Sequence, residues 1–447
     1  MTDHTPDFPT IEAMPTKELF IDMLTRDIAL IPAIIDLVDN CADGAKNLRG
    51  NQSLDGLVVR ISLSAEEFSI TDNCGGITVD TARSYAFRFG RPPGAPSVKH
   101  SVGQFGVGMK RAIFKIGRQF RVESTTSTSH FVVNVDVDQW AKSPEWTFAF
   151  ESLEDPVNQE TESIGTSIRV TSINRDVAAL FNLETFRSDL SGELKSRLQD
   201  PINKGLGIFV NGEPVSVEPL TMLDHAQLRP ALKSLEYTGK GLKRVSVRLY
   251  CGLGSSANRA EAGWSVFCNG RLILEGDKSE VTGWGDEVDD TSIPGFHGQY
   301  NYFRGLAYFD SDDPSRLPWN TTKTGVNTDS PIYRAVKLEM MNLMRPVVDF
   351  LNRLKDEKQA KDDSTEVGPL EELVGSAIAV AVTEVATREV FAAPKVKAKP
   401  LGPKVQRIQY DVDLAQAQAV KRFMDANSWK EVGVATFQYF FTNEVEE

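Results

Sequence analysis

One segment near the start of the chain, Ile35-Asp36-Leu37-Val38-Asp39-Asn40-Cys41-Ala42-Asp43-Gly44-Ala45, carries the pattern from which the fold can be inferred. Apolar residues recur at helical spacing from 16 to 48, which predicts helix on both sides of Pro32. On a helix Asp36, Asn40 and Asp43 share one face. A carboxylate and an amide one turn apart suit Mg²⁺, which prefers oxygen ligands. The alternative is an ordinary solvated helix face.

A second polar segment, Thr71-Asp72-Asn73-Cys74-Gly75-Gly76, follows a predicted strand at 68–71. A carboxylate at Asp72, held at a strand end, can accept a hydrogen bond from an exocyclic amine such as that of adenine. The glycines, Gly76 among them, let a ligand approach the backbone closely. The alternative is a plain Asx turn with glycine at positive φ.

A third segment is rich in glycine and leads into a predicted helix at 109–116. Backbone N–H groups at a helix N-terminus cradle phosphates. No strand precedes the glycines as in a dinucleotide-binding turn, and no Gly-Lys-Ser/Thr follows as in a P-loop. The alternative is a flexible surface loop. The candidate phosphate-binding residues are Gly103, Gln104, Phe105, Gly106, Val107, Gly108 and Lys110.

Taken in this order, the three segments resemble the boxes of the GHKL ATPase superfamily, which includes gyrase B, heat-shock chaperones, histidine kinases, MutL and MORC proteins. The resemblance implies an α+β fold with a Bergerat-type two-layer α/β sandwich, binding ATP and Mg²⁺. Asn40 would hold Mg²⁺, and Asp72 would recognise adenine with support from Thr166 through water. Residues 83–102 would form a lid over the nucleotide.

Two positions depart from the family pattern. Asp36 stands where the family usually has a glutamate as general base, and Asp has one methylene less with which to reach the attacking water. Cys74 replaces the first glycine of the second box. We therefore expect an Mg-dependent ATPase whose hydrolysis is slow, with a non-hydrolysing ATP-bound scaffold as the alternative.

A later block resembles the transducer domain that follows the ATPase domain in gyrase and MutL. The family's transducer sends one lysine to the γ-phosphate, and Lys323 within 316–325 matches it. A cation there would stabilise charge on the transferred phosphoryl group. The alternative is a surface lysine in a turn. The strand 266–273 is similar to strands of MutL and MORC proteins, and no phosphoacceptor helix of a histidine kinase precedes the first box.

The predicted organisation is an ATP-binding domain at 1–190, a transducer-like domain at 200–355, a linker with helix at 356–410 and a small docking or dimerisation element at 411–447. We expect residues 370–390 to be helical. The apolar side chains of the last element fit either docking to a partner protein or packing against the transducer-like domain.

The composition and net charge of the chain argue against several classes of function. With 49 basic and 62 acidic residues the net charge is −13, which argues against autonomous tight binding to nucleic acid. The four cysteines form no metal or disulfide pattern. Neither a signal peptide nor a membrane span is predicted, so a cytoplasmic location is expected.

The expected function is an ATP-dependent switch that closes a lid, forms a homodimer and acts on a macromolecule. DNA, in a MutL- or MORC-like or defence role, and a client protein, as for a chaperone, remain alternatives.

Overall fold

The computed structural model of the chain describes residues 16–26, 28–50, 52–89, 108–156, 164–288, 291–320, 323–359, 367–394 and 408–445. The chain divides into two compact units, Met1–Pro394 and Lys395–Glu447. The predicted boundary between an ATP-binding and a transducer-like domain falls inside the first unit and stays a prediction. Within the described residues, we find no helix with the length and apolar character needed to cross a bilayer.

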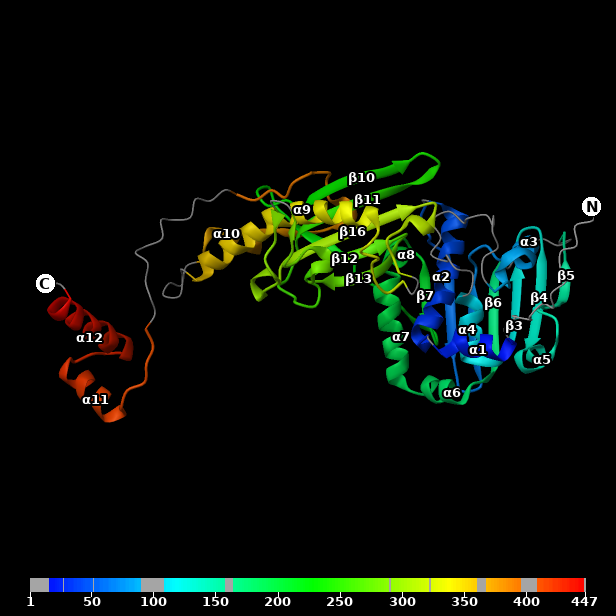
Figure 1. Cartoon of the computed structure of the whole chain (residues 1–447), viewed down its shortest axis with the longest axis horizontal. Coiled ribbons are helices and arrows are strands. Elements are labelled where there is room, and N and C mark those ends of the chain that lie inside the picture. Colours follow the sequence, from blue (N-terminus) through cyan, green and yellow to red (C-terminus); the bar gives the residue numbers. More distant parts are fainter. Residues whose placement is uncertain are drawn as a thin grey trace, which may run out of the picture. The chain divides into compact units, whose positions relative to one another are not determined.

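An eight-stranded mixed sheet organises the first half of the chain, in the order β5-β4-β3-β6-β2-β1-β7-β8 (Figure 1). Among the described strands of this sheet, β1 and β7 pair in parallel and the other neighbours pair antiparallel. Buried residues alternate along β1, so that one of its faces packs on the core. The strands are β1 (Val58–Leu63), β2 (Glu67–Asp72), β3 (Gly117–Thr125), β4 (His130–Asp136), β5 (Phe150–Glu154), β6 (Gly165–Ile173), β7 (Gly207–Val210) and β8 (Glu213–Pro214).

Helices form the second layer, with α2 and α4 packed against each other over the sheet (Figure 1). Ile34, Leu37 and Val38 of α2 lie fully buried in the same core as Val59 and Ile61 of β1. This arrangement confirms the predicted two-layer sandwich. The helices are α1 (Lys17–Arg26), α2 (Leu30–Arg49), α3 (Val79–Thr81), α4 (Gly108–Ile116), α5 (Val137–Lys142), α6 (Arg175–Phe181), α7 (Glu184–Arg197) and α8 (Gln199–Asn203).

A second, five-stranded sheet has the order β10-β11-β16-β12-β13, with β12 and β16 parallel. The long helix α9 (Pro331–Gln359) packs on it, and its buried residues Met340, Met344 and Val347 share a core with the strands. The strands are β10 (Ala231–Gly239), β11 (Leu242–Leu253), β12 (Gly263–Cys268), β13 (Arg271–Asp277) and β16 (Phe303–Ser311).

The segment after α9 corrects one prediction. We expected helix throughout 370–390, but only α10 (Pro369–Ser376) is α-helical there. The chain then forms β17 (Ile378–Ala381), which pairs with β9 (Thr221–Asp224). Alanine and valine suit either structure, and the tertiary pairing with β9 decides for strand. A further short hairpin joins β14 (Glu287–Val288) and β15 (Thr291–Ser292).

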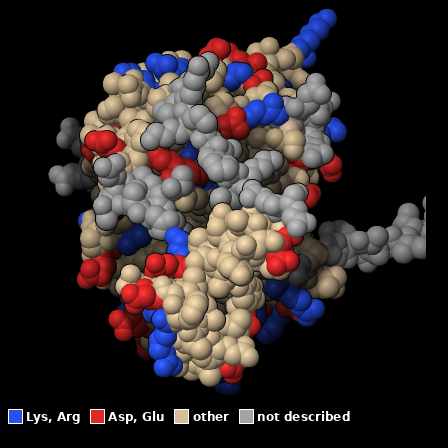
Figure 2. Space-filling model, turned by 90° about the vertical axis from the view of Figure 1, so that its left-hand side faces the viewer, with Lys and Arg blue, Asp and Glu red and all other residues tan. Residues whose placement is uncertain are grey.

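The C-terminal unit, Lys395–Glu447, contributes two described helices, α11 (Leu414–Phe423) and α12 (Trp429–Glu444). Asp413 and Ser428 cap their N-termini with side-chain hydrogen bonds. Neither helix has a buried residue, and Phe423 is 92% exposed. Figure 2 shows this helix pair as a tan area with few charged side chains.

Candidate functional site

Asp36 is a buried carboxylate on α2 that three cations surround. Arg111 Nη2, from α4, lies 2.8 Å from Asp36 Oδ2, and Lys323 Nζ lies 3.3 Å from Oδ1. Arg271 Nη1, from β13, is 3.9 Å from Oδ1. Burial favours the neutral acid, but the positive charges outweigh it and hold the pKa of Asp36 below its ordinary value. Asp36 is therefore ionised at neutral pH.

Lys323 reaches this site from a tight loop of the second half of the chain. The backbone pairs at Trp319 and Val326, and Lys323 N–H donates to Asn320 O at 3.0 Å. Lys323 itself has φ of 55° and is 8% exposed. Burial lowers the pKa of its ammonium, and the carboxylates of α2 oppose that effect. A lysine in a surface turn would be exposed, whereas Lys323 is buried.

Asp39 and Arg271 belong to the same cluster, and the sequence did not single them out as site residues. Asp39 is 1% exposed and forms an ion pair with Arg271, which is 2% exposed. Burial lowers the pKa of Arg271 to about 10. One sequence signal could have located Arg271. An Asn-Gly pair between two apolar runs, here Asn269-Gly270, is typical of a hairpin turn, and Arg271 is the first residue of the strand after that turn.

Asn40 and Asp43 lie on the same helix with different environments. Asn40 is exposed one turn after Asp36, whereas Asp43 is 8% exposed and acts electrostatically on Lys323. No group of three or more His, Cys, Asp or Glu among the described ranges could hold a metal ion. Mg²⁺ keeps several waters and is commonly bound by one or two protein ligands plus phosphates, so a single exposed side-chain amide such as that of Asn40 has the chemistry to serve as one ligand.

Asp72 ends β2 directly opposite Thr166 of β6. Its Oδ1 accepts a hydrogen bond from Cys74 N–H at 2.7 Å. Burial raises the pKa of Asp72, although hydrogen bonds from Cys74, the Cys41 thiol and the Thr166 backbone lower it in part. Thr166 Oγ1 lies 3.1 Å from Ser124 Oγ, so two hydroxyl groups lie on β6, next to Asp72, and on β3 beyond it. A carboxylate with hydroxyl groups beside it can form hydrogen bonds with a base that carries an exocyclic amine.

The turn after Asp72 requires glycine at one position. Gly76 has φ of 71°, and a Cβ on it would collide with the Thr125 carbonyl. Gly75 also has positive φ, 103°, while a Cβ there would meet only the Leu48 side chain, at 3.9 Å. The Cys74 side chain is buried in the core of the sandwich. The turn thus has two glycines at positive φ, although Cys74 replaces the first glycine of the family pattern.

The start of α4 lies against Asp36. A Cβ on Gly108 would stand 3.2 Å from Asp36 Oδ2, so the glycine brings the backbone close to that carboxylate. Lys110 is 3% exposed, and its Nζ donates to Ala86 O at 2.8 Å. Burial lowers its pKa to about 7. The predicted phosphate-binding residues 103–107, and 90–102 of the predicted lid, lie outside the described residues.

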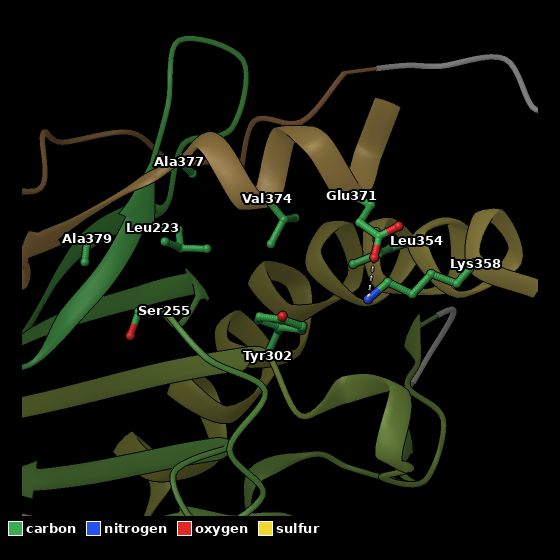
Figure 3. Close-up of a pocket in the computed structure, with 10 residues that line it drawn as sticks. Leu223, Ser255, Tyr302, Leu354, Lys358, Glu371, Val374, Ala377 and Ala379 are labelled. Atoms are coloured by element: carbon green, nitrogen blue, oxygen red, sulfur yellow. Dashed lines mark ion pairs between the residues drawn. The ribbon is translucent and has the colours of Figure 1, made fainter. Parts of the chain in front are cut away.

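A separate pocket of about 420 Å³ lies in the second half of the chain, between α9, α10, β9 and β17 (Figure 3). Leu223, Tyr302 and Val374 line it, and the Lys358–Glu371 ion pair at 3.6 Å stands at its side. None of the cluster residues around Asp36 line it.

Part of the chain matches a known protein family. Residues 28–166 match the family model described as histidine kinase-, DNA gyrase B-, and HSP90-like ATPase. A search of curated proteins found no match to the chain. The matched range contains Asp36, Asn40, Asp72, Gly108 and Thr166.

Proposed function

Residues 28–166 form an ATPase domain of the GHKL superfamily, and from this premise we propose that the chain is an Mg-dependent ATP hydrolase that works as a conformational switch. A domain of this family binds ATP and changes conformation with it. The observation that carries the proposal is the contact between Lys323 and Asp36, which links residues 287 positions apart. A switch needs such a link between the nucleotide and a second part of the molecule.

The proposed roles follow from the chemistry of each side chain. Asp72 would accept the adenine amine, with Thr166 beside it. Asn40 would hold Mg²⁺, which screens phosphate charge when bound. Asp36, ionised and close to Gly108, would orient the attacking water and take its proton. Lys323 would then stabilise charge on the transferred phosphoryl group.

Hydrolysis of ATP and the conformational change would be coupled through the charges of Lys323 and Asp36. In this structure Lys323 contacts Asp36 at 3.3 Å, so the general base and the cation neutralise each other. An incoming phosphate competes for the same ammonium group, which frees the carboxylate to act on water. Binding of ATP would thereby prepare the base and hold the second sheet in place at the same time.

A non-hydrolysing scaffold remains a second candidate, because Asp36 is short and held by cations on both oxygens. We further propose that ATP promotes a homodimer and that the switch acts on DNA or a client protein, in the manner of MutL and MORC proteins or of chaperones. The apolar surface of α11 and α12 supports a partner protein as well.

The experiment is steady-state ATP hydrolysis by the wild type beside Asp36→Ala and Asp36→Glu. We expect Ala to lower turnover by about 100-fold or more, the usual contribution of a general base. The Glu variant should match or exceed the wild type, because its carboxylate reaches further. ATP binding without turnover in the wild type, alone and with DNA, would favour the scaffold. Equal turnover in all three proteins would remove Asp36 from the mechanism.

A further inference from the structure

We propose that Asp39 is a positioning residue, which anchors Arg271 and Lys323 of the second half of the chain to α2 and so keeps Lys323 beside Asp36. The kinetic part of this proposal rests on the proposed ATPase function. Its structural part concerns only how two segments are held against a helix.

Asp39 lies between two buried cations. Asp39 pairs with Arg271, and Lys323 Nζ lies 3.6 Å from Asp39 Oδ2. The same ammonium lies 3.3 Å from Asp36 Oδ1, so the two carboxylates share Lys323. Asp39 directly precedes Asn40 on α2. One side chain thus contacts both Lys323 and Arg271 of β13, and it lies next in sequence to the proposed Mg²⁺ ligand.

The hairpin that carries Arg271 is itself held by hydrogen bonds. Asn269 Nδ2 donates to Ser311 O at 3.1 Å, and Ser311 N–H donates to Asn269 Oδ1 at 2.9 Å. These bonds tie the turn to β16. Lys46 Nζ of α2 donates to Asn269 O at 2.6 Å. A rigid hairpin can therefore transmit the position of the sheet to α2.

Replacing Asp39 by a neutral side chain would leave Arg271 without its partner carboxylate. Arg271 is too buried to be solvated, so it needs a carboxylate partner. The other carboxylate near it is Asp36, 3.9 Å away. Arg271 and Lys323 would then compete for Asp36. The base would be more strongly neutralised and Lys323 displaced, while the adenine side of the site at Asp72 would be unaffected.

The test compares Asp39→Asn, which keeps the shape of the side chain, with Glu261→Gln as matched control. Glu261 is the carboxylate partner of Arg304, at 2.7 Å, and Arg304 is 8% exposed in β16 of the same sheet. Three quantities are measured on the full chain: kcat, the Kd for ATP, and amide hydrogen exchange at 266–273 and 323–326.

We expect Asp39→Asn to lower kcat by about 10- to 100-fold, the usual effect of misplacing a reacting group by an ångström. The Kd for ATP should stay within a factor of about three, since the adenine contacts remain. Exchange should become faster in both segments. Glu261→Gln should leave kcat and exchange at these segments as in the wild type, and Asp39→Glu, which keeps the charge, should recover part of kcat.

A double variant, Asp39→Asn with Arg271→Gln, guards against simple misfolding. Removing both charges of a buried pair is often neutral for stability, whereas removing one is not. If Asp39 positions Lys323, the double variant folds and recovers only the part of kcat that competition from Arg271 had removed, because Lys323 still lacks its contact with Asp39. A double variant that regains wild-type kcat would show that the single variant suffers only from an unpaired arginine, and would overturn the proposal.

Wild-type kcat and wild-type exchange in Asp39→Asn would also overturn it. If the wild type neither binds nor hydrolyses ATP, the proposed function fails. The exchange comparison then still decides whether Asp39 holds the two segments against α2.

Discussion

At the scale of residues, the site is organised by a balance of charge. Asp36 and Asp39 face Arg111, Arg271 and Lys323, all partly or fully buried. Buried ion pairs repay their desolvation only when the geometry is good, so such a cluster is weak evidence for stability. It is better explained as a site built to receive further negative charge. Under the proposed function, the triphosphate of ATP would supply that charge and compete for the same cations.

The Asp72 carboxylate provides the first residue-scale prediction. Asp72→Asn should weaken ATP binding by about 10- to 100-fold, the cost of losing a hydrogen bond to a charged acceptor. The amide that replaces the carboxylate presents a donor to the adenine amine. Calorimetric titration with ATP and GTP measures the effect, and Asp138→Asn is the control because its side chain is 67% exposed on α5. Unchanged ATP affinity would show that the base is recognised elsewhere.

Lys110 provides a prediction about pH. Its pKa falls from 10.5 to about 7 on folding, so between these values the unfolded chain binds more protons than the folded one. Stability must then rise with pH across this window and fall as the pH is lowered through it. The rise from pH 7 to pH 9 should be about 2 kcal/mol without nucleotide.

Denaturant unfolding at the two pH values measures this rise in the wild type and in Lys110→Met. The variant should lack most of the rise, because a thioether does not titrate. Lys115→Met on the same helix serves as control. An equal rise in wild type and Lys110→Met would mean that Lys110 stays charged when folded.

At the scale of elements, the turn between β2 and α3 contains two glycines that can be compared. Both have positive φ, but a Cβ would collide with the backbone only at Gly76. Gly76→Ala should cost about 3 kcal/mol or more, because positive φ adds strain and the new Cβ collides with the Thr125 carbonyl. Gly75→Ala is a matched neighbour with positive φ but space around it, and should cost about 1 kcal/mol. Urea unfolding of both variants gives the two costs. Equal costs would mean that the backbone shifts and the collision is not felt.

Several elements follow from the sequence, and the reasons differ. The apolar spacing of α2 and the alternation of β1 are local patterns, so the helix and the strand could be predicted directly. The proximity of Lys323 to Asp36 could be expected only from the family resemblance, because no local pattern links residues 287 apart. The Asp39–Arg271 pair was missed for the same reason. Ile378–Ala381 were assigned to the wrong element because their pairing with β9 is not local.

At the scale of the whole molecule, the apolar character of the C-terminal unit needs an explanation. Phe423 is 92% and Tyr439 72% exposed, and Trp429 is 52% exposed. Exposed apolar surface of this size usually marks an interaction site, so we expect these side chains to be covered by another protein surface. The two candidates are a partner protein and the first unit of the same chain.

A variant ending at Pro394 separates these candidates. The first unit has its own hydrophobic cores, so we expect the shortened chain to fold and to keep its ATP turnover. If the C-terminal unit serves a partner, the melting temperature should change by less than about 2 °C, because no packing is lost. Binding of a fluorescent apolar dye should fall, since the exposed aromatic side chains are gone.

The full chain carrying Phe423→Ser and Tyr439→Ser is the control, because it removes apolar surface but keeps the chain length. It should show the same loss of dye binding and an unchanged melting temperature. A fall of several degrees in both variants would instead mean that α11 and α12 pack on the first unit through these side chains. In that case these side chains pack within one chain, and a partner protein is not required to explain the apolar surface of α11 and α12.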